Sequence, residues 1–115
     1  MLIRYNKAFE KIAMGLLSFM PKEKDLKKLQ ETIKLYETEK KWRLFLWKEE
    51  EDVIGLVGVQ LFGESSIEVQ HISVNPSHRF EGVGTQMIKA LHEYYADYEI
   101  GPNKDTESFY KQCEL

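Results

Sequence analysis

The sequence predicts an α/β fold of the α+β kind, in which helices flank a mixed, mostly antiparallel sheet. Three observations lead to this prediction. Apolar residues recur at helical spacing before residue 36, β-forming residues separated by turns fill residues 42–74, and a strand–helix–strand–helix order follows. In such layers each helix buries its apolar face against a sheet. At 115 residues, the chain is expected to form one domain over residues 1–115.

Two amphipathic helices are expected near the N-terminus, after a short strand at residues 2–5. The first follows Lys7 and ends at Pro21, because proline inside a helix removes a backbone hydrogen bond. The second covers residues 26–36, with lysines and glutamates opposite its apolar face. The residues of both helices that are expected to face the core are Phe9, Ile12, Ala13, Leu16, Leu17, Met20, Leu26, Leu29, Ile33 and Tyr36.

The remaining strands are expected where β-forming residues are dense, at residues 42–47, 53–62, 67–74 and 98–100. The charged segment 48–52 is interpreted as a solvated hairpin turn, so its acidic residues are not predicted to bind a metal. Two further helices are predicted at residues 82–95 and 106–113. The residues of the earlier one that are expected to face the core are Val83, Met87, Ile88, Leu91 and Tyr94.

Composition excludes several classes of function. A formal net charge of −3 argues against a general nucleic-acid binder, and the basic stretches 22–28 and 40–43 are interpreted as solvated helix surface. No apolar run approaches the roughly 20 residues that span a bilayer, and the charged N-terminus does not fit a signal peptide. The single cysteine, Cys113, cannot form an internal disulfide. We therefore expect a cytoplasmic protein without a nucleic-acid or membrane partner.

The sharpest functional signal is segment 74–85, where a strand ends, a polar loop follows and two glycines open an amphipathic helix. A pyrophosphate needs free backbone N–H groups, and a helix N-terminus supplies them together with the positive end of its dipole. Glycine lets the backbone approach a ligand closely. Arg79 adds charge or holds the loop in shape. The alternative is an ordinary strand-to-helix turn, in which Gly82 and Gly84 serve packing.

This segment carries a family resemblance. The pattern Arg79-x-x-Gly82-x-Gly84, preceded by His71-Ile-Ser-Val-Asn-Pro76, resembles the acyl-CoA signature of the GNAT N-acetyltransferases. The resemblance implies the GNAT acyl-CoA N-acyltransferase fold, shortened at its C-terminus, with acetyl-CoA (coenzyme A) as co-substrate. The whole chain also resembles the GNAT-like proteins that are encoded with riboflavin-biosynthesis genes in some bacteria.

The resemblance also implies how the cofactor binds. In the family, the loop offers backbone amides to the pyrophosphate, and the preceding strand pairs with the pantetheine arm. Two neighbouring strands splay to open that edge, usually helped by a bulge, and here these are the strands at residues 67–74 and 98–100. The residues implied in cofactor binding are Ile72, Ser73, Val74, Arg79, Phe80, Glu81, Gly82, Val83, Gly84, Thr85, Asn103 and Phe109.

Acetyl transfer to an amine needs a neutral amine, a stabilised oxyanion and a proton for the leaving thiolate. Glu68 stands eleven positions before Arg79, which is the spacing of the general base in histone-type members of the family, so Glu68 is the predicted base. In a regular strand it shares a face with Gln70, Ile72 and Val74. The alternative is a solvent-facing strand glutamate.

Tyr110 is the predicted acid, because Asn103-x-x-Thr106-x-x-Phe109-Tyr110 resembles the family's later motif, in which a helix carries a tyrosine beside the CoA sulfur. A buried structural tyrosine is the alternative. His71 has a suitable pKa range for a base but points to the other face unless a bulge re-aims it, and it is interpreted as a satisfied core or edge histidine.

The chain departs from the family after Tyr110, where it reads Lys111-Gln-Cys-Glu-Leu115 in place of further strands. We expect an acceptor groove that is open, completed by a partner subunit or truncated, and a homodimer that covers the exposed edge is one prediction. Two functions stay open. The first is an N-acetyltransferase acting on a small-molecule amine or a protein lysine, and the second is a CoA-binding module with a regulatory or structural role.

Overall fold

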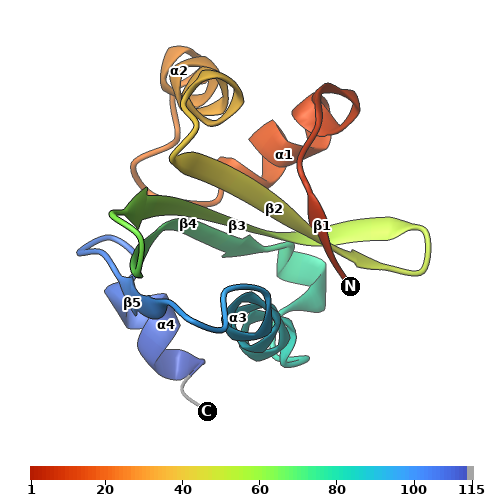
Figure 1. Cartoon of the computed structure of the whole chain (residues 1–115). Coiled ribbons are helices and arrows are strands. Elements are labelled where there is room, and N and C mark those ends of the chain that lie inside the picture. The colour runs from red at the N-terminus through yellow and green to blue at the C-terminus, as the bar shows by residue number, and fades with distance from the viewer. Residues whose placement is uncertain (114–115) are drawn as a thin grey trace.

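In the computed structural model, which describes residues 1–113, a five-stranded sheet lies between two layers of helices (Figure 1). Glu114 and Leu115 lie outside the described residues. The strands are β1 (Leu2–Arg4), β2 (Trp42–Glu49), β3 (Asp52–Phe62), β4 (Ser66–Val74) and β5 (Glu99–Pro102). The helices are α1 (Glu10–Leu17), α2 (Leu26–Thr38), α3 (Val83–Tyr94) and α4 (Glu107–Gln112), with the 3₁₀ turns η1 (Lys7–Phe9) and η2 (Pro76–His78).

The strands follow one another across the sheet in chain order, β1-β2-β3-β4-β5. Neighbouring strands are antiparallel except for β4 and β5, which are parallel because α3 connects them across one face. The predicted mixed, mostly antiparallel sheet flanked by helices is therefore confirmed. Among residues 1–113, no helix is long and apolar enough to cross a membrane.

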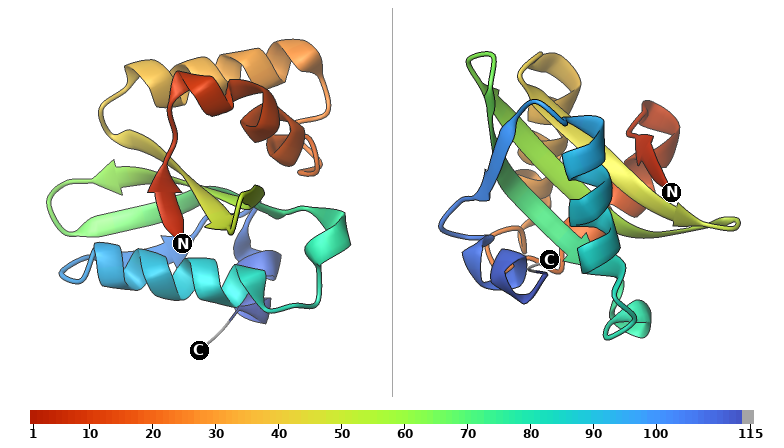
Figure 2. Two further views of the ribbon diagram at one scale, coloured as in Figure 1. Left: turned by 90° about the vertical axis from the view of Figure 1, so that its right-hand side faces the viewer. Right: turned by 60° about the horizontal axis from the view of Figure 1, so that its bottom comes forward.

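Each face of the sheet has its own apolar cluster, and Figure 2 shows the two helical layers on opposite faces. On one face α1 and α2 contribute Leu16 and Ile33, which pack against Leu46 of β2. On the other face α3 contributes Met87 and Leu91. Burying each side chain of this size contributes about 1.5–3 kcal/mol, so the helices are held on the sheet mainly by these contacts.

Three of the residues predicted to face the core are exposed instead: Ile12, Leu26 and Tyr94. The buried residues of α1 are Ala13, Leu16 and Leu17, and Ile12 lies at the margin of the face that they form. At the other end of the chain, α3 ends at Tyr94. Tyr95 then leaves the helical conformation with φ −114° and ψ 58°, and its ring is buried against the sheet in place of that of Tyr94.

A β-bulge in β4 decides which side chains share a face. Gly58 pairs with His71 and Val59 pairs with Val69, so Gln70 is the extra residue on β4. The side-chain alternation therefore shifts by one residue at this point. Ile67 and Val69 before the bulge, and Ile72 and Val74 after it, all join the cluster under α3. The predicted common face of Glu68 with Ile72 and Val74 is wrong for this reason, whereas His71 turns toward α1 and α2.

The parallel pairing of β4 and β5 stops just before the bulge. Its last pair is Val69 with Pro102, so residues 70–74 of β4 have no strand partner on that edge within the described chain. The carbonyl of Val69 accepts hydrogen bonds from the Asn103 backbone at 3.2 Å and from the Thr106 hydroxyl at 2.8 Å. These bonds fix the turn into α4, so the chain leaves the edge of β4 after Pro102. The expected opening of this edge is therefore present, beside a bulge.

Candidate functional site

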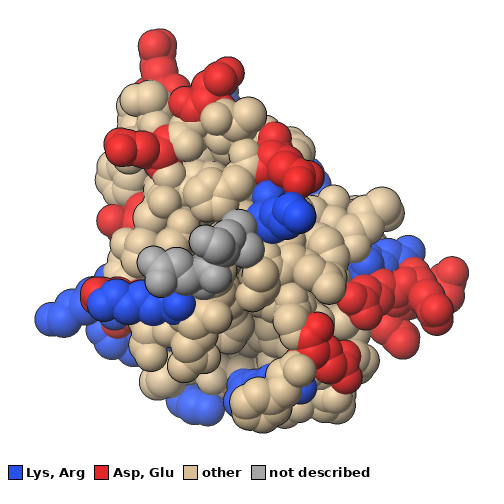
Figure 3. Space-filling view, turned by 90° about the horizontal axis from the view of Figure 1, so that it is seen from below, with Lys and Arg blue, Asp and Glu red and all other residues tan. Residues whose placement is uncertain are grey.

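A groove runs from the open edge of β4 to the first turn of α3. It consists of two adjoining hollows of about 230 and 510 Å³, which share Val74, Arg79, Phe109 and Gln112. Figure 3 looks onto the side of α3 and α4, where uncharged side chains cover much of the centre and charged ones gather at the margins. The charged residues that line the groove are Arg79 and Asp105, and Asp105 is paired with Lys22.

The backbone at the start of α3 is arranged for an anion. Gly82 is the N-cap with φ 78°, a left-handed conformation that strains other residues, and no described side chain caps the helix. The N–H groups of Val83, Gly84 and Thr85 have no partner within the helix. These three residues also line the larger hollow. A Cβ added to Gly82 would meet no described atom within 4 Å, so this side of the loop is accessible.

Gly84 has a different role from Gly82. A Cβ at Gly84 would lie 2.7 Å from Cε1 of Phe109 and 2.8 Å from Sγ of Cys113. The absence of a side chain therefore lets α4 pack closely on α3 and form one wall of the groove. Burial raises the pKa of the Cys113 thiol, and a hydrogen bond involving Thr85 only partly opposes this effect. Cys113 is thus a buried, protonated wall residue, which fits its interpretation as a small apolar side chain.

The groove brings together most residues implied in cofactor binding. Those that line it are Ile72, Ser73, Val74, Arg79, Phe80, Gly82, Val83, Gly84, Thr85 and Phe109. Ser73 is buried and its hydroxyl donates to the Leu16 carbonyl at 2.7 Å, which ties β4 to α1. Two implied residues lie elsewhere. Glu81 faces a separate hollow beside Glu49 and Glu50, and Asn103 faces the pocket on the other side of β4.

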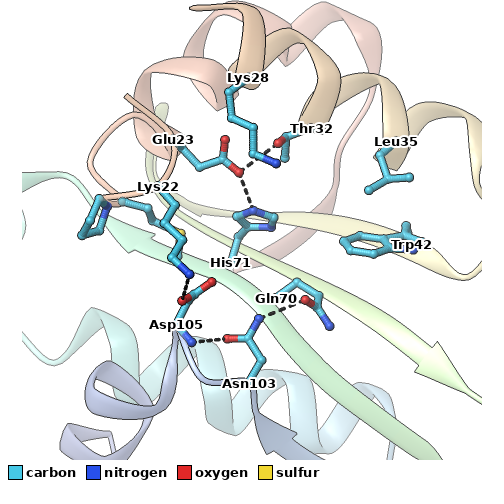
Figure 4. Close-up of a pocket in the computed structure, with 12 residues that line it drawn as sticks. Lys22, Glu23, Lys28, Thr32, Leu35, Trp42, Gln70, His71, Asn103 and Asp105 are labelled. Atoms are coloured by element: carbon cyan, nitrogen blue, oxygen red, sulfur yellow. Dashed lines mark hydrogen bonds and ion pairs between the residues drawn. The ribbon is translucent and has the colours of Figure 1, made fainter. Parts of the chain in front are cut away.

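That second pocket, of about 260 Å³, lies at the splay between β4 and the turn into α4 (Figure 4). The loop between α1 and α2 forms one side of it, and Gln70 and His71 of β4 form its floor. Asn103 donates to Gln70 at 2.9 Å across the splay, and Lys22 pairs with Asp105 at 2.9 Å. The pocket and the groove share Met20, Pro21 and Asp105, so they adjoin.

A buried polar network centres on His71. Its Nε2 lies 2.8 Å from Oε1 of Glu23, which also accepts from the Thr32 hydroxyl at 2.8 Å, while Nδ1 is bonded to the Tyr36 hydroxyl. An ionised carboxylate only accepts, so Nε2 carries the proton and Nδ1 accepts from Tyr36. Burial raises the pKa of Tyr36 well above its usual value, which keeps its hydroxyl a donor. Both ring nitrogens of His71 are therefore occupied, as expected for a satisfied histidine.

Glu23 is 2% exposed, although it lies in a strongly charged stretch of sequence. Burial alone raises the pKa of a carboxyl group. Here the hydrogen bonds from His71 and Thr32, with the electrostatic attraction of the His71 ring N–H and the Lys28 ammonium, outweigh burial and hold the pKa of Glu23 below its usual value. The carboxylate is thus ionised near neutral pH. Its Oε2 atom is buried and has no hydrogen-bond partner among the described residues.

The two predicted catalytic residues lie outside both the groove and the pocket at the splay. Glu68 precedes the bulge, accepts a hydrogen bond from Gln70 at 2.8 Å and lines a shallow hollow over the paired part of β4 and β5. Tyr110 donates to the Ile100 carbonyl at 3.1 Å and contacts His92, and burial raises the pKa of its hydroxyl. The side chains of α4 that do line the groove are Ser108, Phe109 and Gln112, and Cys113 follows at the end of the helix.

Sequence reasoning missed the partners of His71. Tyr36 was recognisable only as a residue of the core face of α2, and Glu23 lies in a stretch that was interpreted as solvated. Glu23 and Tyr36 are separated from His71 by 48 and 35 positions. No local pattern of residue types marks such distant partners.

Comparisons of the sequence with a family model and with a related protein both indicate an acetyltransferase family. The sequence matches the model of the Acetyltransferase (GNAT) family over residues 10–114. It is 64% identical over 115 residues to the uncharacterized N-acetyltransferase in the lysA 3′ region of Bacillus methanolicus, a match that covers 100% of this chain and 96% of that protein.

Solved structures share the fold at low sequence identity. Aminoglycoside 6′-N-acetyltransferase AAC(6′)-IG from Acinetobacter haemolyticus superposes with a TM-score of 0.78 at 17% identity, covering 100% of this chain and 90% of that chain. AAC(6′)-Iy in complex with the bisubstrate analogue CoA-S-monomethyl-acetylneamine gives a TM-score of 0.71 at 18% identity, covering 97% and 84%.

Proposed function

Because the chain belongs to the GNAT acetyltransferase family, we propose that it binds acetyl-CoA along the groove and transfers the acetyl group to a primary amine. The observation that carries this proposal is the continuity of the open edge of β4 with the uncapped start of α3. The structure of AAC(6′)-Iy with a CoA analogue supports it, because that protein has the same fold.

The groove provides a place for each part of the cofactor. The N–H groups of Val83, Gly84 and Thr85 and the Arg79 side chain would hold the pyrophosphate by charge and hydrogen bonding. The unpaired edge of β4 after the bulge would pair with the amide groups of the pantetheine arm, as an added strand does. Following β4 toward the splay, the thioester would reach the point where the groove adjoins the second pocket.

Binding of acetyl-CoA is tested most directly at Gly82. We expect Gly82→Trp to weaken binding at least about tenfold in a calorimetric titration, because the indole would fill the space next to the free N–H groups. Gly63→Trp is the matched control. Gly63 also has a positive φ, 65° against 78°, and open surroundings among the described residues, but it lies in the β3–β4 turn. Absence of binding by the folded wild type would contradict the proposal.

We further propose the roles that the sequence suggested for Glu68 and Tyr110. The attacking amine loses a proton to Glu68, directly or through water, as its nitrogen bonds to the acetyl carbon. Tyr110 gives a proton to the sulfur as the carbon–sulfur bond breaks. For this step the Tyr110 hydroxyl has to exchange the Ile100 carbonyl for the sulfur.

Kinetics of Glu68→Gln and Tyr110→Phe test these roles. Loss of general acid or base catalysis is expected to lower kcat about 100-fold in each variant, with acetyl-CoA affinity within about twofold of wild type. The conservative changes keep size and shape, and circular dichroism checks the fold. If kcat is unchanged in both variants, other groups perform the proton transfers.

A CoA-binding module without efficient turnover is the second candidate function. The observation that favours it is that neither Glu68 nor Tyr110 lines the pocket beside the groove. Four features remain predictions of the sequence. They are the resemblance to GNAT-like proteins encoded with riboflavin-biosynthesis genes and its link to riboflavin metabolism, a cytoplasmic location, a protein lysine as acceptor, and a homodimer.

A further inference from the structure

We propose that the pocket at the splay selects small primary amines that carry an anionic group, a carboxylate or a phosphate, and that Lys28 holds this group. The inference rests on the proposed acetyl transfer and names its acceptor class. It begins from position, because the pocket adjoins the groove through Met20, Pro21 and Asp105. A molecule in this pocket would therefore meet the thioester end of the bound cofactor.

The size of the pocket limits the acceptor. Its volume of about 260 Å³ is below the range of roughly 300–1,000 Å³ that is typical of pockets for drug-sized ligands. The walls combine Leu35 and Trp42 on one side with the polar floor of β4. Such a pocket fits a short amine with a few carbon atoms between its functional groups, with the carbon atoms against the apolar wall.

The pocket wall carries charges of both signs. Glu23 supplies a buried carboxylate, which is ionised and keeps one oxygen atom without a hydrogen-bond partner among residues 1–113. Lys22 is neutralised by its ion pair with Asp105. Lys28 also lines the pocket, but it makes no ion pair within the described chain (Figure 4). Lys28 is near enough to Glu23 to help lower the pKa of its carboxyl group, but it forms no ion pair with Glu23 among the described residues, so its ammonium can still pair with an anion in the pocket.

This arrangement discriminates between amines that differ in the group at the end opposite the attacking nitrogen. An acceptor with a carboxylate or phosphate would pair with Lys28 while its amine attacks the thioester. A plain alkylamine offers no group that pairs with Lys28, and a diamine brings a like charge to it. Because Lys28 is exposed, salt screens the interaction, so the preference is expected to weaken as ionic strength rises.

The preference is tested with acetyl-CoA and four acceptors of similar length in a thiol-release assay. These are propylamine, 1,3-diaminopropane, 3-aminopropanoate and 3-aminopropyl phosphate. The two anionic acceptors are expected to give a kcat/KM at least about tenfold above that of the other two. The ratio between the carboxylate and the phosphate then distinguishes the two sources of negative charge.

Two variants test whether Lys28 causes the preference for anionic acceptors. Lys28→Gln is expected to raise KM for the anionic acceptors about tenfold more than KM for propylamine, and to leave acetyl-CoA affinity unchanged because Lys28 does not line the groove. Lys27→Gln is the matched control, since it removes the same charge from the adjacent residue, which does not line the pocket. Equal or slower reaction of the anionic acceptors, no acetylation of any of the four, or equal effects of both variants would overturn the inference. If acetyl-CoA binds in these experiments, the proposed cofactor function stands even when the acceptor preference fails.

Discussion

Replacing Glu23 by alanine is expected to lower the free energy of unfolding by about 3 kcal/mol, measured by urea denaturation at neutral pH. The substitution removes the acceptor of hydrogen bonds from His71 and Thr32, and it leaves these largely buried donors without that partner. Glu31→Ala is the control, because Glu31 is on the exposed face of α2 and should change the stability by no more than about 0.5 kcal/mol. Equal effects of the two changes would show that the network contributes nothing to stability.

Glu23→Gln keeps the size and shape of the side chain and removes only its charge, so it isolates the contribution of that charge to stability. The pKa of Glu23 is below its usual value of 4.5 in the folded protein, so the unfolded chain binds more protons in that range. The stabilisation that comes from ionised Glu23 is complete above pH 4.5, and it is lost as the pH falls through the lower pKa that Glu23 has in the folded protein. We expect wild-type stability to fall more steeply than that of Glu23→Gln on acidification from about pH 6 to pH 3. Parallel pH profiles would contradict the ionised, hydrogen-bonded carboxylate.

Gly58→Ala is expected to destabilise the protein by about 2–4 kcal/mol, the second large effect. A Cβ at Gly58 would overlap the Tyr36 hydroxyl oxygen and would lie 2.5 Å from the adjacent ring carbon. The Tyr36 ring is buried and packs edge-on against Trp42 at 5.4 Å, so it can move only by disrupting the core. Moving it also breaks the bond to His71 at the bulge.

Two further variants make this result specific to the contact. Gly15→Ala introduces the same methyl group into α1, where it meets no described atom within 4 Å, and is expected to stabilise the helix by about 0.5–1 kcal/mol. Combining Gly58→Ala with Tyr36→Leu should cost less than the sum of the two single changes, because they share one contact. Additive costs would contradict the steric explanation.

Much of the fold could be predicted from local patterns. The helical spacing of Leu29, Ile33 and Tyr36, the proline after the first helix and the Asn75-Pro76 break after β4 locate elements to within a few residues. The glycine pattern at Gly82 and Gly84 likewise located the loop that opens the groove, because a positive φ and a close helix contact leave a signature in residue type. Helix ends were less predictable, and for that reason Tyr95 is the buried tyrosine and not Tyr94 as predicted.

The sequence by itself therefore determined the elements, their order and the family of this protein, since periodicity and turn residues act within a few positions. Only the tertiary structure decided which side chains meet. One extra residue at Gln70 shifts the side-chain alternation of β4, turns His71 toward α2 and separates Glu68 from Ile72 and Val74. Glu23 is buried because a partner 48 positions away satisfies its charge. A shift in strand pairing and a distant hydrogen bond depend on the packed chain as a whole, so no local pattern can specify them.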